Sequence, residues 1–269
     1  NTKTRFDPRL NYQFLQAGDH LASIKNYQKA SLFYSLTMAP KEIVESYKGL
    51  LTDIKPRLDY YKKRQKKFGK NFPSNEEKML NKLQLEFDTI SRKQKRVTEM
   101  LQTPDNDYTK DLRWRKAKNF ESMGRDWEAY WGFMGLVTDY PKADKDRREN
   151  YMYATFVQAE KIGKRDAARE IADRYLKNPD FQKYAYEVGL RLAGMYKDQA
   201  EKYKKQSETA ETPPEAEHWR RKSNENFDDM WALCTKLLDQ KPKDKLASHV
   251  VYMMGSGWIA RGEEKFPEL

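Results

Sequence analysis

Residues 18–40 read GDHLASIKNYQKASLFYSLTMAP, and two later stretches repeat the pattern of this one. Residues 118–141 read KNFESMGRDWEAYWGFMGLVTDYP, and residues 156–179 read FVQAEKIGKRDAAREIADRYLKNP. Each stretch has a glycine in its first half, an alanine near its middle and a proline at its end. A pattern that recurs in this way predicts a chain built from repeated structural units, and such a repeat decides the fold.

Each unit reads as two helices joined by a tight turn. Apolar residues recur every three and four positions, which is the spacing of an amphipathic helix. A glycine permits the turn, a small alanine lets the two helices approach closely, and proline ends the second helix because it lacks a backbone N–H. Gly124 and Gly163 precede the aligned alanine by five residues, whereas Gly18 precedes it by twelve. The aligned alanines are Ala30, Ala129 and Ala168.

These units resemble the tetratricopeptide repeat, a family whose unit has about 34 residues. In that family small residues stand at positions 8 and 20 of the unit, an aromatic residue at 24 and a proline at 32. The resemblance implies an α-solenoid of antiparallel helix pairs. The first proline arrives two residues early, and in the third unit Ala172 replaces the aromatic and Pro179 is one residue early. The matching residues are Gly18, Leu21, Tyr27, Ala30 and Tyr34, then Ala117, Ala129, Phe133 and Pro141, then Ala168.

Helical spacing dominates the whole chain, and the fold class we expect is therefore all-α. Residues 1–40 are expected to form the first helix pair, residues 41–103 a helical insertion, and residues 104–269 the remaining pairs and a C-terminal helix. We expect these parts to make one continuous solenoid domain. The predicted helices are 9–25, 26–39, 41–68, 75–102, 108–123, 125–139, 145–162, 164–177, 181–207, 215–240 and 245–260.

The insertion at 41–103 carries two heptad-like seams. Mostly apolar residues step alternately by four and three along 47–61 and along 80–101, which is the 3.5-residue period of a coiled coil. A turn is expected at 69–75, so the insertion should be a long antiparallel hairpin of two helices. Pro56 should kink or split the first of them. The sequence leaves open whether this hairpin projects or packs into the groove of the solenoid.

Positive charge is concentrated in this hairpin. The chain has a net charge of +11, and residues 41–103 hold 16 Lys and Arg against 9 Asp and Glu. One hypothesis is an arm that binds anions, and the other is a solvated face of a protruding hairpin. The candidate anion-binding residues are Lys62, Lys63, Arg64, Lys66, Lys67, Lys70, Arg92, Lys93, Lys95 and Arg96.

The resemblance also implies where a partner would bind. In the family, the first helix of each pair lines the concave face, and a few exposed positions on it contact the partner. Large aromatic residues at such positions suit interface anchors. The alternative is that each residue packs against the neighbouring repeat or the hairpin. Carried over, the contact residues are Tyr12, Asp19, Trp114, Lys118, Asn150 and Tyr153, with Leu15, Asp111, Glu121 and Glu160 at further contact positions.

No motif in the chain predicts catalysis, a metal or a cofactor. The three histidines have no ligand at metal-binding spacing, and we expect the only cysteine, Cys234, to be a buried, inert thiol. Residues 255–262, GSGWIARG, lack the preceding strand and the lysine of a phosphate loop, so a broken or ending helix is expected there. We expect the carboxylates of DKDRREN, 144–150, to lie on helix surfaces or to cap helices.

Composition narrows the class further. No run of about 20 apolar residues exists, so we expect no transmembrane helix, and an aromatic content of 13% argues against full disorder. The chain begins at Asn1 rather than Met, which indicates a processed or trimmed form.

Two functions are compatible with these features. The first is a non-catalytic scaffold that binds a peptide or protein segment in a concave groove. Because WGFMGLVTDYP resembles the ending of bacterial cell-envelope members of the family, we expect a periplasmic or envelope location, with the cytoplasm as the alternative. The second function is an anion-binding module whose basic hairpin holds nucleic acid or an anionic membrane surface.

Overall fold

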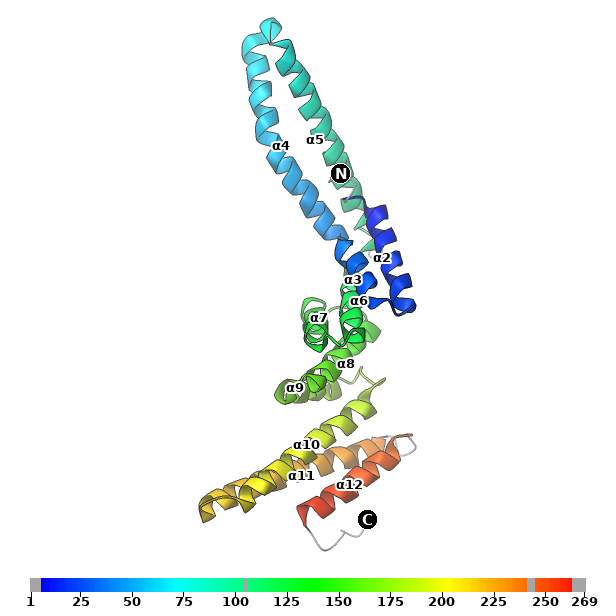
Figure 1. The fold of residues 1–269 in the computed structure, drawn as a ribbon, viewed down its shortest axis with the longest axis vertical. Coiled ribbons are helices and arrows are strands. Elements are labelled where there is room, and N and C mark those ends of the chain that lie inside the picture. The colour runs from blue at the N-terminus through cyan, green and yellow to red at the C-terminus, as the bar shows by residue number, and fades with distance from the viewer. Residues whose placement is uncertain (1–5, 104–105, 241–244, 263–269) are drawn as a thin grey trace. The chain divides into compact units, whose positions relative to one another are not determined.

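The computed structural model describes residues 6–103, 106–240 and 245–262. Its regular elements in these ranges are eleven α-helices and one short 3₁₀ helix, η1, so the all-α prediction is confirmed (Figure 1). Each predicted helix overlaps one observed helix. No helix in the described ranges is long and apolar enough to cross a bilayer. The helices are α2 Pro8–Ser23, α3 Tyr27–Leu36, α4 Pro40–Phe68, α5 Ser74–Met100, α6 Thr109–Ser122, α7 Asp126–Asp139, α8 Lys145–Lys161, α9 Arg165–Lys177, α10 Ala185–Glu208, α11 Pro213–Gln240 and α12 Ala247–Arg261, with η1 at Gly69–Asn71.

Neighbouring helices pack in sequence order within two compact units, Asn1–Gly132 and Phe133–Leu269. In the first unit α2 packs on α3, α4 packs on α5, and α6 contacts both α2 and α3. In the second unit α8 packs on α9, α9 on α10, α10 on α11, and α12 on both α10 and α11. The continuous solenoid expected from the sequence stays a prediction.

Small residues bring the paired helices together. Ala30, Ala129 and Ala168 are fully buried, in agreement with their predicted role. A Cβ on Gly18 would lie only 2.5 Å from a ring carbon of Tyr34, so this glycine permits close approach of α2 and α3. The prediction that Gly18 forms the turn is therefore wrong, since it lies inside α2.

The turn between α2 and α3 instead uses Lys25. This residue has a φ of 61°, and Gly124 and Gly163 have φ values of 70° and 72° in the later turns. All three residues precede the aligned alanine by five positions. A left-handed backbone conformation favours glycine because glycine has no Cβ. The first turn therefore has the same left-handed position as the other two, but a lysine, which is less suited to it, stands there.

The insertion forms the predicted antiparallel hairpin, α4 and α5. Its two seams meet in one core, in which the buried residues are Ile43, Tyr47, Ile54, Leu58, Leu80, Leu83, Ile90 and Val97. α4 continues through Pro56 without a break, so the predicted split does not occur. Pro56 has no N–H to donate to the Thr52 carbonyl, and both residues are exposed, so solvent is available to replace the missing donor.

Within the first unit the hairpin projects away from α2, α3 and α6, with η1 at its far end (Figure 1). Its base is fixed by hydrogen bonds to neighbouring segments. The Tyr47 hydroxyl donates to the Phe6 carbonyl at 2.9 Å, and the Tyr108 hydroxyl donates to the Met38 carbonyl at 2.9 Å. The far end of the hairpin therefore does not fill the face formed by α2 and α6.

Candidate interaction surfaces

The first helices of the first two pairs, α2 and α6, lie side by side. Arg115 on α6 donates from Nε to both carboxylate oxygens of Asp19 on α2, at 2.7 and 2.8 Å. The Tyr34 hydroxyl donates to the same carboxylate at 2.8 Å, and burial followed by Asp19 raises the pKa of this tyrosine. Near the other end of α2, the rings of Tyr12 and Tyr108 have centroids 6.1 Å apart.

The predicted contact residues of this unit differ in their exposure. Tyr12 is 50% exposed, Lys118 is exposed and forms an ion pair with Glu121, and Trp114 is half-buried. Leu15 is only 3% exposed because it packs in the core between α2, α3 and α6, so it is not available to a partner. Tyr12 is therefore the most accessible aromatic residue among the predicted contacts.

In the second unit, the predicted contact residues on α8 contact the start of α10. The rings of Tyr153 and Tyr184 stack with centroids 3.9 Å apart and planes 10° apart. The Tyr153 hydroxyl donates to Glu187 at 2.8 Å, and burial followed by this carboxylate raises the pKa of Tyr153. Asn150 accepts hydrogen bonds from the Tyr184 hydroxyl at 3.0 Å and from Lys183 Nζ at 3.3 Å.

A further pair extends this contact along the two helices. Arg191 on α10 forms ion pairs with Glu160 on α8 at 2.7 Å and with Glu187 at 2.9 Å. All three side chains are 35–38% exposed. The residues predicted to contact a partner thus connect α8 to α10. This agrees with the alternative that they pack against the neighbouring helix pair, although part of each side chain remains accessible.

One carboxylate of this unit, that of Glu149, is buried, although the sequence predicts an exposed or capping position for it. Glu149 is only 3% exposed and accepts hydrogen bonds from the Tyr175 hydroxyl and the Lys183 backbone N–H. The expectation that every carboxylate of 144–150 lies on the surface is therefore wrong. Asp144 does cap α8, since its side chain accepts from the Arg147 N–H at 2.9 Å.

The predicted anion-binding residues fall into two separate groups. The lysines at 62, 63, 66, 67 and 70 are exposed at the far end of the hairpin. Arg64 is different, because its guanidinium forms two 2.8 Å hydrogen bonds with Glu76.

The second group lies on the C-terminal half of α5, towards the base of the hairpin. Lys95 pairs with Glu99 at 3.8 Å, and Arg92 donates to the Asp88 carbonyl at 3.3 Å. Lys93 and Arg96 line a cavity of about 300 Å³ beside the first residues of α2. The structure therefore does not unite the two basic stretches in one patch.

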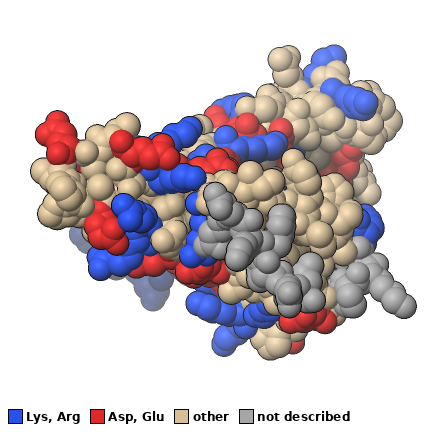
Figure 2. Space-filling view, turned by 90° about the horizontal axis from the view of Figure 1, so that it is seen from below, with Lys and Arg blue, Asp and Glu red and all other residues tan. Residues whose placement is uncertain are grey.

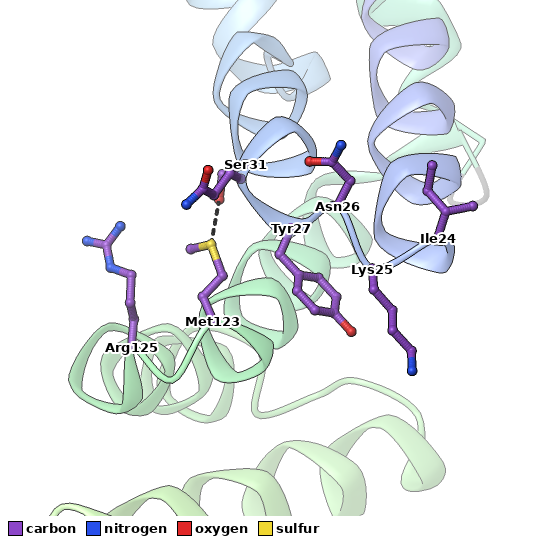
Figure 3. A pocket seen from close by; sticks show the side chains of 8 residues that line it. Ile24, Lys25, Asn26, Tyr27, Ser31, Met123 and Arg125 are labelled. Carbon is purple, nitrogen blue, oxygen red and sulfur yellow. Dashed lines mark hydrogen bonds between the residues drawn. The ribbon is translucent and has the colours of Figure 1, made fainter.

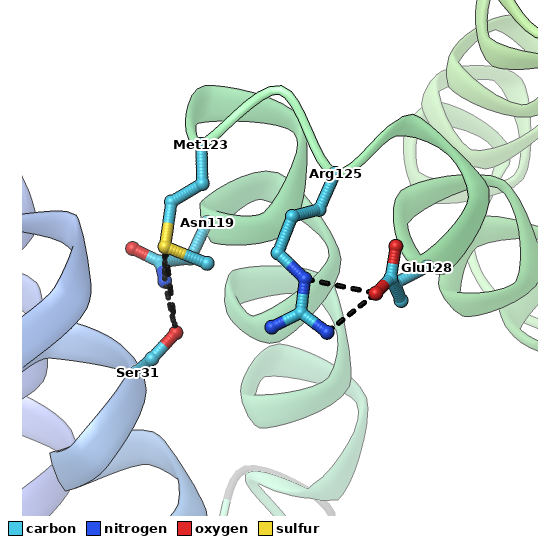
Figure 4. Close-up of polar contacts among 5 residues, drawn as sticks. All are labelled: Ser31, Asn119, Met123, Arg125 and Glu128. Atoms are coloured by element: carbon cyan, nitrogen blue, oxygen red, sulfur yellow. Dashed lines mark hydrogen bonds and ion pairs between the residues drawn. The ribbon is translucent and has the colours of Figure 1, made fainter.

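A larger hollow, of about 890 Å³, lies between the α2–α3 turn and the end of α6 (Figure 3). Arg125 at its edge is held by Glu128, with one contact of 2.8 Å, and the buried Asn119 donates to Ser31 Oγ at 2.7 Å (Figure 4). Sequence reasoning missed this hollow because it requires two turns 100 residues apart in the chain to lie together. Its lining residues are Ile24, Lys25, Asn26, Tyr27, Gln28, Ser31, Met123 and Arg125.

Charges of both signs lie side by side over the face shown in Figure 2. Within the second unit, Lys222 pairs with Glu225 at 3.2 Å and Arg261 pairs with Asp228 at 2.9 Å. Such exposed pairs contribute about 0–1 kcal/mol each to stability. Their presence means that basic residues here are partly neutralised locally, unlike the lysines at the hairpin tip.

Cys234 is fully buried, as predicted, and burial raises the pKa of its thiol to about 12. A thiol in that state is a poor nucleophile at neutral pH.

In the part of the chain that the structure describes, no group of three or more His, Cys, Asp and Glu side chains could hold a metal ion. The expected helix end at 255–262 is found, since α12 runs to Arg261 and is capped by Gly262, which has a φ of 82°.

Comparisons of the chain with models of protein families, with curated proteins and with solved structures return no match. The tetratricopeptide resemblance therefore rests on the residues quoted for it.

Proposed function

We propose that this protein is a non-catalytic scaffold of the tetratricopeptide-like kind, which binds a peptide or protein segment on the face formed by α2 and α6. The observation that carries this proposal is the contact between Asp19 and Arg115, which holds the two first helices side by side. In an α-solenoid, consecutive helix pairs stack in this order and create an extended concave binding surface.

Two further features support the repeat. The turns at Lys25, Gly124 and Gly163 share one left-handed position at the same distance from the aligned alanine. In the second unit, the Tyr153–Tyr184 stack brings the first helices α8 and α10 together in the same order. The hairpin is an insertion between α3 and α6 that leaves the contact of α2 with α6 in place.

The chemistry of the α2–α6 face favours a partner that offers apolar and polar groups together. On α2, Tyr12 supplies an exposed aromatic ring. On α6, Trp114 supplies a half-buried ring, and Lys118, four residues later, supplies an exposed amine. Aromatic residues of this kind carry a large share of the binding energy in protein interfaces. We place the partner segment across Tyr12 and Trp114.

Affinity capture from extract of the native source, at near-physiological salt, tests the proposal. We expect wild type to retain a stoichiometric protein, and Trp114→Ala to reduce its recovery by at least about tenfold, as for an interface anchor. Trp127→Ala on α7 is the matched control, since Trp127 is 51% exposed on a second helix of a pair. Equal recovery with wild type and Trp114→Ala would contradict the proposal.

A further inference from the structure

The far end of the α4–α5 hairpin carries five exposed lysines within nine residues, Lys62, Lys63, Lys66, Lys67 and Lys70. In the ranges that the structure describes, none of them forms an ion pair. Lys62 with Lys66, and Lys63 with Lys67, are also spaced by four residues on one helix, where like charges destabilise the helix. The hairpin thus maintains an unfavourable concentration of charge at its end.

Aromatic residues are exposed at the same end. Tyr60 is 53% exposed and Phe68 is 40% exposed. The Arg64 guanidinium lies 5.2 Å from the centre of the Phe68 ring, and Lys67 Nζ lies 5.9 Å from it. Leu58 on α4 and Leu80 on α5 are the buried core residues nearest to the turn. The exposed ring of Phe68 is therefore not part of the core of the hairpin.

We propose that this tip docks on an anionic membrane surface. The lysines would lie against lipid phosphates, and Phe68 would enter the interface between headgroups and acyl chains. Basic residues near an anionic bilayer attract it strongly, and apolar side chains beside them add to the binding. This inference is independent of the scaffold proposed for α2 and α6.

The shape of the charged region favours a membrane over a nucleic acid. A single strand binds along a continuous basic groove with aromatic residues on which its bases stack. Here the second basic group begins at Arg92, which lies about 27 Å along α5 from Ser74 at the rise of an α-helix. The exposed residues between them have both signs of charge, Glu77 and Asp88 as well as Lys78 and Lys82. The four basic residues of the second group do not form one continuous groove with the lysines of the tip. Docking on a flat membrane surface needs only the charged and aromatic residues of the tip.

The test is sedimentation of the full chain with vesicles of phosphatidylglycerol and phosphatidylcholine, compared with vesicles of phosphatidylcholine alone. Each lysine near an anionic surface contributes about fivefold to binding. The variant with Lys62, Lys63, Lys66 and Lys67 all changed to Gln should therefore bind anionic vesicles several hundredfold more weakly. Phe68→Ala should reduce binding severalfold and leave the charge unchanged.

The matched control changes four exposed lysines outside the hairpin, Lys29, Lys142, Lys202 and Lys236, to Gln, which lowers the net charge by the same amount. It should keep binding within a few fold of wild type, and neither variant should lower the thermal midpoint. Three results would overturn the proposal: no binding of wild type to anionic vesicles at low salt, an equal loss in the control, or tighter binding of a single-stranded oligonucleotide through the same four lysines.

Discussion

Arg115 on α6 places its Nε 2.7 and 2.8 Å from the two carboxylate oxygens of Asp19 on α2. The two residues are 96 positions apart, and the whole hairpin at 41–103 lies between them in the chain. The contact therefore links α2 to α6 across the insertion, beside the core in which Leu15 and Leu112 of the two helices pack. It also fixes which side chains of the two helices share a face, and the proposed binding surface depends on that arrangement.

A double-mutant cycle with Asp19→Ala and Arg115→Ala should give a coupling energy of about 0.5–1 kcal/mol. The value is modest because the two side chains are 36% and 34% exposed. Urea unfolding of the four proteins measures it. Arg9→Ala on α2 and Asp59→Ala on α4, two exposed charged side chains of the same unit, form a control cycle, for which no coupling is expected. A coupling energy near zero for Asp19 and Arg115 would show that this ion pair does not help to hold α2 and α6 together.

Gly18→Ala should destabilise the first unit by about 1–3 kcal/mol, because its Cβ would overlap the ring of Tyr34. The control is Gly49→Ala on α4, where no heavy atom lies within 4 Å of the added Cβ. That change should stabilise the helix by about 0.5–1 kcal/mol, since alanine loses less backbone entropy than glycine. Thermal melting of the two variants measures the difference. If both glycines responded alike, the close approach of α2 and α3 would not be supported.

Lys25→Gly should be more stable than Lys25→Ala by about 1 kcal/mol. Both changes remove the same charge, and they differ only in the Cβ at a position with a φ of 61°. Chemical denaturation of the two proteins isolates this backbone term. Equal stability of the two variants would mean that the α2–α3 turn does not share the geometry of the turns at Gly124 and Gly163.

Alkaline pH should destabilise the protein through its buried tyrosines. Burial or partial burial raises the pKa of at least six of them, and a group with a raised pKa in the folded state loses its stabilising contribution as pH rises. The loss should begin near pH 10, about the pKa of a tyrosine in an unfolded chain. The six are Tyr34, Tyr47, Tyr108, Tyr153, Tyr175 and Tyr196.

Absorbance at 295 nm, recorded together with helicity, measures this effect. Part of the tyrosinate signal should appear only as the helices unfold, and Tyr34→Phe should reduce the size of that part. A single ionisation step completed near pH 10, before any loss of helicity, would show that these hydroxyls are not protected by the fold.

The positions of the helices could be predicted from the sequence because they depend on local spacing. The hairpin core is an example, since the seams at 47–61 and 80–101 determine which residues meet once the turn is placed. The role of Lys25 could not be predicted, because its side chain gives no sign that its backbone is left-handed. Only the five-residue distance to Ala30, which Gly124 and Gly163 share with their own alanines, contained that information.

The candidate sites were harder to predict because they depend on which helices become neighbours. Asn150 and Tyr153 were placed on the correct helix, but their contacts with Tyr184 and Glu187 follow from the packing of α8 against the start of α10. The burial of Glu149 had no signal in the sequence, since a carboxylate in a charged stretch is usually solvated. The basic stretches are visible in the sequence, whereas their separation along α5 required the geometry of the hairpin.

Photo-cross-linking from position 12 would show whether a partner segment lies on the α2–α6 face. A photoreactive phenylalanine analogue replaces Tyr12 in one protein and Leu32 in another, since these side chains are 50% and 56% exposed on α2 and α3 respectively. In extract of the native source, we expect a discrete adduct from position 12 that is absent from position 32. An adduct from position 32 alone, or none from position 12, would contradict the claim that α2 and α6 carry the binding face.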